Sequence, residues 1–454
     1  MLPIHLDANA CVHHLSRAIA CPTFGYVDQT HGNTQAFFRL QQQLEQDFPK
    51  CFQTLTYRTV NTFSRLYRWA GRDGGKPPIL LMAHQDVVPI SPGTEKDWVH
   101  PPFSGAIADG CVWGRGAIDM KNTLIALFEA MEYLIGQGFV PEQDVYLCTG
   151  HDEEIMDVHG SMAVAQLCRD EGLHFEFVLD EGGSFMDGAA FGAPGTTLAS
   201  VCVYEKGYCD VRLTCRSEGG HSSRPGDCTA LGEMARALIA LEQNKFPIRA
   251  TQTLLDLYSI LAPYCEPQTK QMALQPQVYG QQLAQRLAQS GPYGNAMVRT
   301  TTAVTQIGAS EAPNVLPQRV WANVNFRLNA GDTMEDLRRF VERIVGPQFE
   351  VELPIAWNPT KQARVQARGY RLIAQTLASF YPDVVVAPMA FFGGTDSRCF
   401  DDLADDVYKY MPFLSHMKYA ATMHGTNERI DIDDYLRGIA FYIRLIEAAC
   451  GAER

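Results

Sequence analysis

ILLMAHQD at residues 79–86 joins a short apolar run to an imidazole, an amide and a carboxylate. VYLCT (145–149) and FEFVL (175–179) are similar runs, and both also lead into polar residues. Short, predominantly apolar runs are typical of strands that are buried on both faces of a parallel sheet. Helical patterns at 119–136 and 159–171 separate the three runs. The sequence therefore predicts an α/β fold.

The polar residues at the ends of these runs form the first candidate site. They are His84, Gln85 and Asp86 after the first run, His151, Asp152, Glu153 and Glu154 after the second, and Asp180 and Glu181 after the third. Because ligands bind outside the carboxyl ends of the strands in open α/β sheets, we expect these residues to converge in one crevice. GRGAID (114–119) adds Asp119 at the start of a helix. Converging carboxylates repel one another, and mixed His and carboxylate ligands suit Zn²⁺ or Co²⁺.

Each of these residues also has a purely structural interpretation. Asp119 is well placed to cap the helix that follows it. Glu153 and Glu154 could form a solvated acidic turn, and His84 could be a core histidine. These separate structural interpretations do not explain why all three strand ends carry ligand-type side chains. A divalent metal site is the hypothesis that explains them together.

The middle of the chain has a different pattern. GYCDVRLTCRS (207–217) alternates polar and apolar residues, as expected of a strand with one solvated face. Helical patterns follow at 229–243 and 334–345, and strand patterns at 300–308, 319–328 and 349–356. We expect an α+β domain at 207–356, inserted between two parts of a catalytic domain at 1–206 and 357–454. The Gln-rich stretch 271–289, within the poorly patterned 262–294, has no function that we can name.

Composition limits the class of protein. The 454 residues carry a net charge of −13, which argues against a protein that binds nucleic acid or anionic membranes. The 13 Cys are scattered, with no C-x-x-C pair, which favours reduced thiols in the cytoplasm. We find no signal-peptide pattern and no apolar run long enough to cross a membrane.

Ten motifs occur in an order and spacing that resemble a known family. They are HQDVVPI (84–90), WVHPPFSG (98–105), WGRGAIDMKN (113–122), DEE (152–154), LDEGG (179–183), GGHSSRP (219–225), APNVLP (312–317), NFRL (325–328), GGTDSR (393–398) and HGTNE (424–428). The chain resembles the co-catalytic di-zinc hydrolases that include carboxypeptidase S, aminoacylase, acetylornithine deacetylase and succinyl-diaminopimelate desuccinylase. The W-x-x-P-P-F-S-G and D-x-K-N motifs are most similar to the carboxypeptidase S branch. The resemblance implies a phosphorylase/hydrolase-like di-zinc catalytic domain with an inserted α+β lid and dimerisation domain.

The resemblance also implies a metal shell. Asp119 would bridge two Zn²⁺ ions, or Co²⁺ or Mn²⁺ in their place. The remaining ligands would be His84 and Asp180 at one ion, and Glu154 and His424 at the other. Glu153 would be the general base, and Asp86 would orient His84. In the family the peptide bond after the bridging Asp is cis, here Asp119–Met120.

The inserted domain would supply the rest of the site. In relatives the His of the G-G-H motif, here His221, crosses a dimer interface to hold the oxyanion. Asn314 and Arg327 would bind the substrate carboxylate, and Gly394 and Thr395 would line the opposite wall. Without the resemblance, a turn histidine would be the preferred interpretation of His221, and Arg327 could be a solvent-facing strand residue.

These inferences predict a homodimeric metal-dependent hydrolase that acts on small substrates. It would cleave an amide bond beside a free carboxylate, as a carboxypeptidase or dipeptidase does. Asp180 as ligand, in place of Glu, favours peptidases within the family. An N-acyl-amino-acid deacylase with the same site is the main alternative. A catalytically silent binding relative is a remote alternative, because every catalytic and ligand position is filled.

Overall fold

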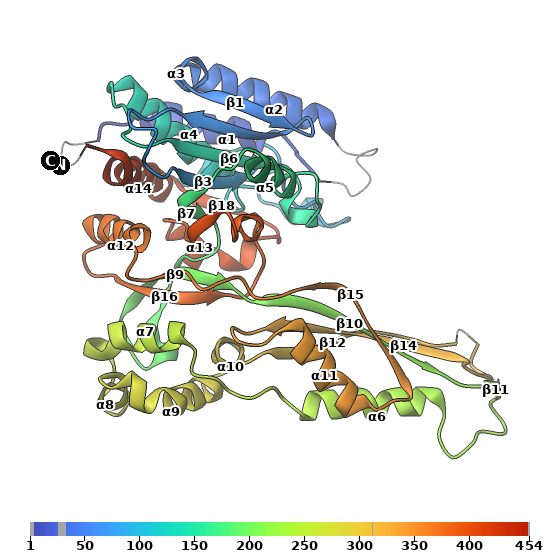
Figure 1. Ribbon diagram of the computed structural model, residues 1–454. Helices are drawn as coiled ribbons and strands as arrows, with labels where there is room; N and C mark the ends of the chain where they lie inside the picture. The colour runs from blue at the N-terminus through green and yellow to red at the C-terminus, as the bar shows by residue number, and fades with distance from the viewer. Residues whose placement is uncertain (1–3, 26–32, 311, 453–454) are drawn as a thin grey trace.

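A nine-stranded sheet forms the centre of the computed structural model, which describes residues 4–25, 33–310 and 312–452 (Figure 1). The strand order is β1-β2-β6-β3-β7-β17-β9-β16, and β8 pairs with β9. These strands are β1 (Thr56–Val60), β2 (Ser64–Trp69), β3 (Ile79–His84), β6 (Val145–Gly150), β7 (Phe175–Asp180), β8 (Phe185–Asp187), β9 (Thr197–Glu205), β16 (Val385–Phe391) and β17 (Ala404–Lys409). Since β3, β6, β7 and β17 are parallel, their carboxyl ends meet at one edge of the sheet.

Helices cover both faces of this sheet, as an α/β fold requires. One face packs against α1 (Ala8–Ile19), α2 (Thr34–Asp47), α3 (Pro49–Thr54), α4 (Lys121–Gly136), α12 (Arg368–Phe380) and α14 (Ile432–Cys450). The other face packs against α5 (Ser161–Asp170). Within β3, Leu81 belongs to the first core and Leu80 to the second. A strand buried on both faces explains why this run is continuously apolar.

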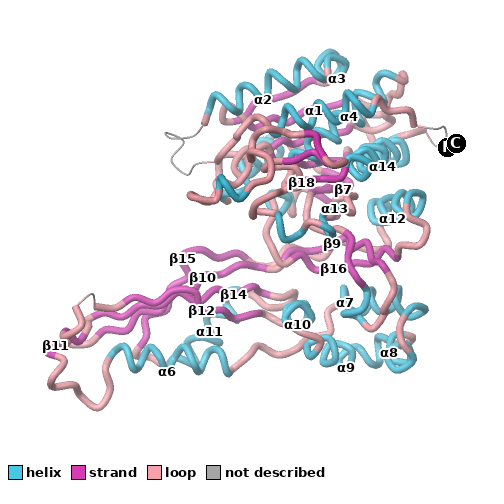
Figure 2. The backbone as a smooth tube through the Cα atoms, turned by 180° about the vertical axis from the view of Figure 1, so that it is seen from behind, coloured by secondary structure: helices cyan, strands magenta, loops and turns pink. Residues whose placement is uncertain are grey.

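A second, four-stranded sheet lies in the inserted segment and is antiparallel, with the order β12-β14-β10-β15. Its strands are β10 (Gly207–Arg216), β12 (Thr301–Gly308), β14 (Arg319–Leu328) and β15 (Phe349–Trp357), and α6 (Ala230–Gln243) and α11 (Met334–Val345) cover one face. The short strands β11 (Gly220–His221) and β13 (Val315–Leu316) pair at the far end of this sheet (Figures 1 and 2). The predicted α/β fold with an inserted α+β unit is confirmed.

The poorly patterned stretch 262–294 lies in a helical layer. The layer consists of α7 (Gln252–Leu261), α8 (Pro267–Ala273), α9 (Pro276–Gln289) and α10 (Pro292–Val298). It packs on β9 and β16 of the large sheet, where Leu257 shares a core with Leu198 and Met389 (Figure 1). Three of these helices begin at a proline and two of them are short, which left little periodicity to detect. The inserted span 207–356 thus contributes to two cores, and its exact boundaries stay a prediction.

A small sheet, β18-β5-β4, joins the C-terminal part of the chain to the loop that carries Asp119. It contains β4 (Ile107–Ala108), β5 (Cys111–Trp113) and β18 (Arg429–Asp431), and α13 (Ser415–Lys418) lies beside β18. The Asp119–Met120 peptide bond is cis, as the family resemblance implied. Among the described residues, no helix is long and apolar enough to cross a membrane.

Candidate metal centre

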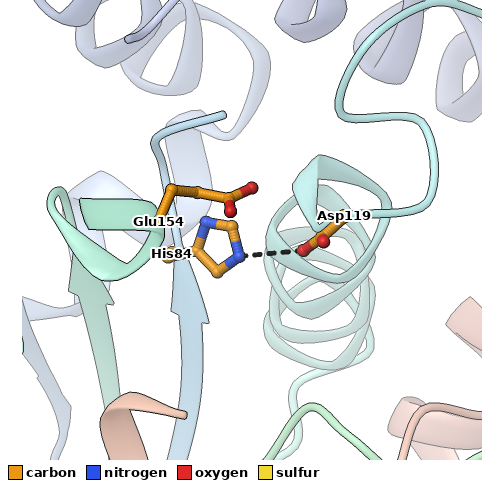
Figure 3. Close-up of side chains that lie close together, drawn as sticks. All are labelled: His84, Asp119 and Glu154. Carbon is orange, nitrogen blue, oxygen red and sulfur yellow. Dashed lines mark hydrogen bonds and ion pairs between the residues drawn. The ribbon is translucent and has the colours of Figure 1, made fainter. Parts of the chain in front are cut away.

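Four ligand-type side chains meet at the carboxyl edge of the large sheet, three of which Figure 3 shows. The two carboxylate oxygens of Asp119 face different histidines: Oδ1 lies 3.1 Å from His84 Nε2, and Oδ2 lies 2.9 Å from His424 Nε2. The same His424 nitrogen lies 3.2 Å from Glu154 Oε2. These residues come from β3, from the loops before α4 and β18, and from the turn after β6. One carboxylate between two imidazoles is an arrangement that can bridge two cations.

The structure places Glu181, not Asp180, beside His84. Glu181 Oε1 lies 3.5 Å from His84 Nε2, and His84, Glu153 and Glu181 can direct ligand atoms toward a common point. Asp180 Oδ2 instead accepts a hydrogen bond of 3.0 Å from the amide of Ser397. Asp180 is the last residue of β7 and Glu181 follows it, and of the two only Glu181 faces His84. Glu181, and not the predicted Asp180, is therefore the carboxylate that lies beside His84.

The electrostatics of the cluster fit a divalent cation. Burial raises the pKa of Glu181 well above its usual range, and the nearby Asp119 raises it further. Hydrogen bonds to Asp119 and Glu154 raise the pKa of His424 to about 10. Glu154 Oε1 is buried and has no hydrogen-bond partner among the described residues. Carboxylates and imidazoles that are forced together in this way, with an unused buried oxygen, form a donor set suited to Zn²⁺, Co²⁺ or Mn²⁺.

Asp86 connects the metal cluster to the predicted general base. Its carboxylate lies 3.4 Å from His84 Nδ1, on the side of the ring opposite the cluster. It also accepts hydrogen bonds from the amides of Glu153 and Glu154, at 3.3 and 3.0 Å. The backbone carbonyl of Asp86 lies closer to His84 Nδ1, at 3.0 Å, so this residue contacts both the ring of His84 and the turn that carries Glu153. The predicted role of Asp86 in orienting His84 stays a prediction.

The carboxylate of Glu153 belongs to the same buried edge. Burial raises the pKa of Glu153 well above the usual range. The nearby His84 lowers this pKa, whereas the carboxylates of Asp396 and Asp119 raise it further. A carboxylate in such surroundings holds a proton more readily than an exposed one, which suits a group that must accept a proton and pass it on. The geometry is compatible with the predicted role of Glu153 as base.

Glu428 is a supporting residue that the sequence analysis did not single out. It is fully buried, accepts a hydrogen bond of 2.6 Å from Arg115, and accepts others from the amides of Gly116 and Ile118, at 2.9 and 2.8 Å. These contacts fix the loop that ends at Asp119. Glu428 lies in the HGTNE motif, but its partners are more than 300 residues away, so no local pattern could reveal the contact.

Three of the predicted substrate-binding residues meet where the insertion joins the large sheet. The guanidinium of Arg327 donates to the carbonyl of Phe392 at 3.2 Å, next to the loop with Gly394. Thr395 is buried, and its hydroxyl donates to Glu205 Oε1 at 2.7 Å. The Thr395 amide also donates to Glu205 Oε2 at 3.3 Å, so the contacts of this residue support the loop.

His221 and Asn314 lie together but far from the metal cluster. Ser222, which follows His221, donates its amide to the carbonyl of Asn314 at 3.0 Å, and both predicted residues are exposed. Both views place β11, which contains His221, at the end of the inserted sheet that points away from β3 and β7 (Figures 1 and 2). Within one chain the structure does not bring them to the site.

Comparisons with known proteins agree with this architecture. The model of peptidase family M20/M25/M40 matches residues 80–448. "Probable carboxypeptidase S-like 2" of Dictyostelium discoideum is 32% identical, over 98% of this chain and 87% of its own. Human "N-fatty-acyl-amino acid synthase/hydrolase PM20D1" is 33% identical, over 96% and 87% of the two chains.

A solved structure shows the same fold at low sequence identity. The M20 family metallo-carboxypeptidase Sso-CP2 from Sulfolobus solfataricus superimposes with a TM-score of 0.69 and 17% identity, covering 96% of this chain and 98% of that one. The family model matches most of the chain, and relatives above 30% identity cover nearly all of it. The chain belongs to peptidase family M20/M25/M40, in its carboxypeptidase S branch.

Proposed function

We propose that the protein hydrolyses the amide bond of N-acyl amino acids, substrates in which the scissile bond lies beside a free carboxylate. Metal-dependent amide hydrolysis follows from the family. The choice of N-acyl amino acids over peptides rests on one observation in particular. Glu181 Oε1, and not a carboxylate oxygen of Asp180, lies beside His84 Nε2.

This observation reverses an expectation from the sequence. The preference for peptidases depended on Asp180 as the ligand, and with Glu181 in that position the same family trend favours deacylases. The human relative whose name includes N-fatty-acyl-amino acid hydrolase supports the same choice. Carboxypeptidase or dipeptidase activity is the second candidate, which the carboxypeptidase S-like relative and the solved carboxypeptidase favour.

His84, Asp119, Glu154, Glu181 and His424 would hold two divalent ions, with Asp119 shared between them. Such ions, when bound, lower the pKa of water and stabilise developing negative charge on oxygen. Glu153 takes a proton from the attacking water and passes it to the leaving amine. Arg327 binds the substrate carboxylate from the inserted sheet, where it already lies 4.6 Å over the ring of Tyr208.

The proposal includes a homodimer. His221 and Asn314 are exposed at a tip that cannot serve the site of its own chain in this conformation (Figure 1). In such a dimer, the tip of one subunit would enter the site of its partner, where His221 would serve as the oxyanion donor. We also propose a reducing compartment such as the cytoplasm, because the thirteen cysteines are free thiols and most of them are buried.

A substrate screen tests the proposal. Metal-free protein is reconstituted with Zn²⁺, Co²⁺ or Mn²⁺ and assayed on N-acyl amino acids, on dipeptides, and on the same compounds with an amidated carboxyl group. We expect the highest kcat/KM on N-acyl amino acids, a large loss on amidation, and no turnover without metal. Turnover of dipeptides alone would contradict the proposed substrate class and favour the second candidate.

A further inference from the structure

A row of stacked side chains begins at Arg327, the predicted carboxylate-binding residue. In the register of the inserted sheet, Tyr208 of β10 lies opposite Arg327 of β14 on one side and opposite Trp357 of β15 on the other. The guanidinium of Arg327 lies 4.6 Å from the centre of the Tyr208 ring, and the rings of Tyr208 and Trp357 stack with centroids 4.8 Å apart. Residues opposite one another on neighbouring strands stand side by side, so the pairing of these three strands builds the row (Figure 1).

The row lies on the face of the sheet that α6 and α11 do not cover. Cys209 and Phe326, the sequence neighbours of Tyr208 and Arg327, belong to the core beneath these two helices. Because successive side chains of a strand point to opposite faces, Tyr208 and Arg327 point away from that core. The row is therefore free to contact a second part of the molecule.

The segment 392–398, which follows β16 of the large sheet, contacts both ends of the row. At one end the Arg327 guanidinium donates to the carbonyl of Phe392 at 3.2 Å. At the other end the guanidinium of Arg398 lies 4.1 Å from the centre of the Trp357 ring. A Cβ atom on Gly394 would lie 3.3 Å from Nη1 of Arg398 and 4.0 Å from the Trp357 ring. Arg327, Tyr208, Trp357 and Arg398 thus form one stacked row, against which the predicted substrate wall at Gly394 packs.

Arg327 has a charge that its surroundings do not neutralise. In the described part of the chain it contacts the carbonyl of Phe392 and the ring of Tyr208, and no carboxylate forms an ion pair with it. The carboxylate of Asp210 already accepts three hydrogen bonds, from the Tyr208 hydroxyl at 3.0 Å and from two asparagine side chains at 2.9 Å each. Burial lowers the pKa of Arg327, and the nearby Asp210 compensates only in part. A guanidinium in this state is suited to bind an incoming carboxylate.

The stacking decides how this guanidinium is oriented. A guanidinium presents its donors in one plane, so the way that this plane is held determines the direction in which it binds a carboxylate. The ring of Tyr208 holds the plane of Arg327, and Tyr208 is itself held by Trp357 and by its hydrogen bond to Asp210. An arginine that is oriented before the substrate arrives loses less entropy on binding.

We propose that Tyr208, Trp357 and Arg398 are positioning residues, which hold the guanidinium of Arg327 in the orientation that binds the substrate carboxylate. The inference rests on the proposed function and identifies the residues through which the enzyme distinguishes a free carboxylate from an uncharged amide. Because both ends of the row contact the segment 392–398, this recognition also depends on the contact between the inserted sheet and that segment.

The test compares kcat and KM for substrates with a free carboxyl group and for the same compounds with an amidated one, in Zn²⁺-reconstituted enzyme. A hydrogen bond to a charged group contributes about 10–100-fold in affinity, so Trp357→Ala should raise KM for the free acids about tenfold. The kcat for the free acids and both constants for the amides should stay near the parental values. Trp357→Phe, which keeps an aromatic ring beside Tyr208, should restore most of the lost KM.

Trp321→Ala is the matched control. Trp321 lies on the same face of the sheet, six residues before Arg327 in β14, and its ring centre is also 4.1 Å from an arginine, Arg212. The control therefore loses an equal arginine–tryptophan contact without a change beside Arg327, and its KM for the free acids should match that of the parent. Circular dichroism and thermal unfolding compare the folding of the two variants.

A binding measurement extends the comparison to protein that does not turn over. Calorimetry follows the binding of N-acetylmethionine and of its carboxamide to Zn²⁺-loaded Glu153→Ala protein, with and without Trp357→Ala. We expect the acid to bind more tightly than the carboxamide, and Trp357→Ala to remove most of that difference. If Trp357→Ala discriminates acids from amides as well as the parent does, or if Trp321→Ala impairs this discrimination equally, the positioning role is wrong.

The outcomes separate this inference from the proposed function. If the parent enzyme turns over dipeptides and no N-acyl amino acid, the proposed substrate class is wrong, and free and amidated dipeptides test the row in the same way. A Trp357→Ala enzyme that loses kcat equally on acids and amides would show a merely structural role. A parent protein that does not distinguish acids from amides in either assay would refute carboxylate binding by Arg327, and the positioning role with it.

Discussion

At the carboxyl ends of β3 and β7, His84 and Glu181 are buried and contact one another, whereas at β11 and β13 His221 and Asn314 are exposed to solvent. The first region is held from several sides: Asp86 contacts His84, and Glu428 fixes the loop that carries Asp119. The second is held by a short backbone ladder that pairs Gly220 with Leu316 and His221 with Val315. The difference supports our proposal that the metal ligands all come from one chain, and that the tip of the insertion acts in the site of a partner subunit.

The largest effect should come from the buried region. Glu153→Ala should lower kcat by about 10²–10⁴-fold, because the variant lacks the group that accepts and delivers the proton. Its metal content should stay near that of the parent protein. Glu154→Ala should instead lose metal, since the imidazole of His424 contacts its carboxylate directly. Steady-state kinetics and metal analysis of both variants check this contrast; a Glu153→Ala enzyme with near-parental kcat would refute the role of Glu153 as base.

Substitution of His221 at the exposed tip should lower kcat less than substitution of Glu153 does, and subunits of the partner type should be able to restore activity. His221→Ala should lower kcat by about 10²–10³-fold, the usual contribution of a preorganised oxyanion donor, with metal content unchanged. Since a twofold-symmetric dimer has two equivalent sites, equal mixing with Glu153→Ala subunits should return about a quarter of parental activity. Subunit exchange is followed by native mass spectrometry. Exchange without recovery of activity would mean that His221 does not act in the partner's site.

The supporting contacts of the buried region should give the smallest effect. Glu428→Gln keeps the size of the side chain and removes the charge opposite Arg115, so metal affinity should fall about 10–100-fold, as is typical of residues that orient metal ligands. Glu171→Gln, which removes an exposed partner of Arg58, should leave metal affinity unchanged. Competition with a chromophoric chelator gives both affinities. Equal affinities in the two variants would show that Glu428 does not support the metal centre.

The same contrast explains what could be predicted from the sequence. The buried strands and the convergence of His84, Asp119 and Glu154 follow from local patterns, because parallel strands bring their carboxyl ends to one edge. The choice between Asp180 and Glu181 depends on which way the last residues of β7 point, and a one-residue change in register reverses it. Glu428 and Glu205 act through contacts with residues far away in the sequence, which no local pattern reveals. The helices α8 and α9 were missed because a Gln-rich amphipathic pattern of this length is weak.

We propose a two-metal centre in which Glu181, and not Asp180, is a ligand. The most direct test is the metal content of dialysed, Zn²⁺-reconstituted protein, measured by mass spectrometry for the parent, Glu181→Ala and Asp180→Ala, with circular dichroism to confirm folding. We expect two ions per chain in the parent and in Asp180→Ala, and a loss of occupancy in Glu181→Ala. One ion or fewer in the parent protein, or a loss confined to Asp180→Ala, would contradict the account.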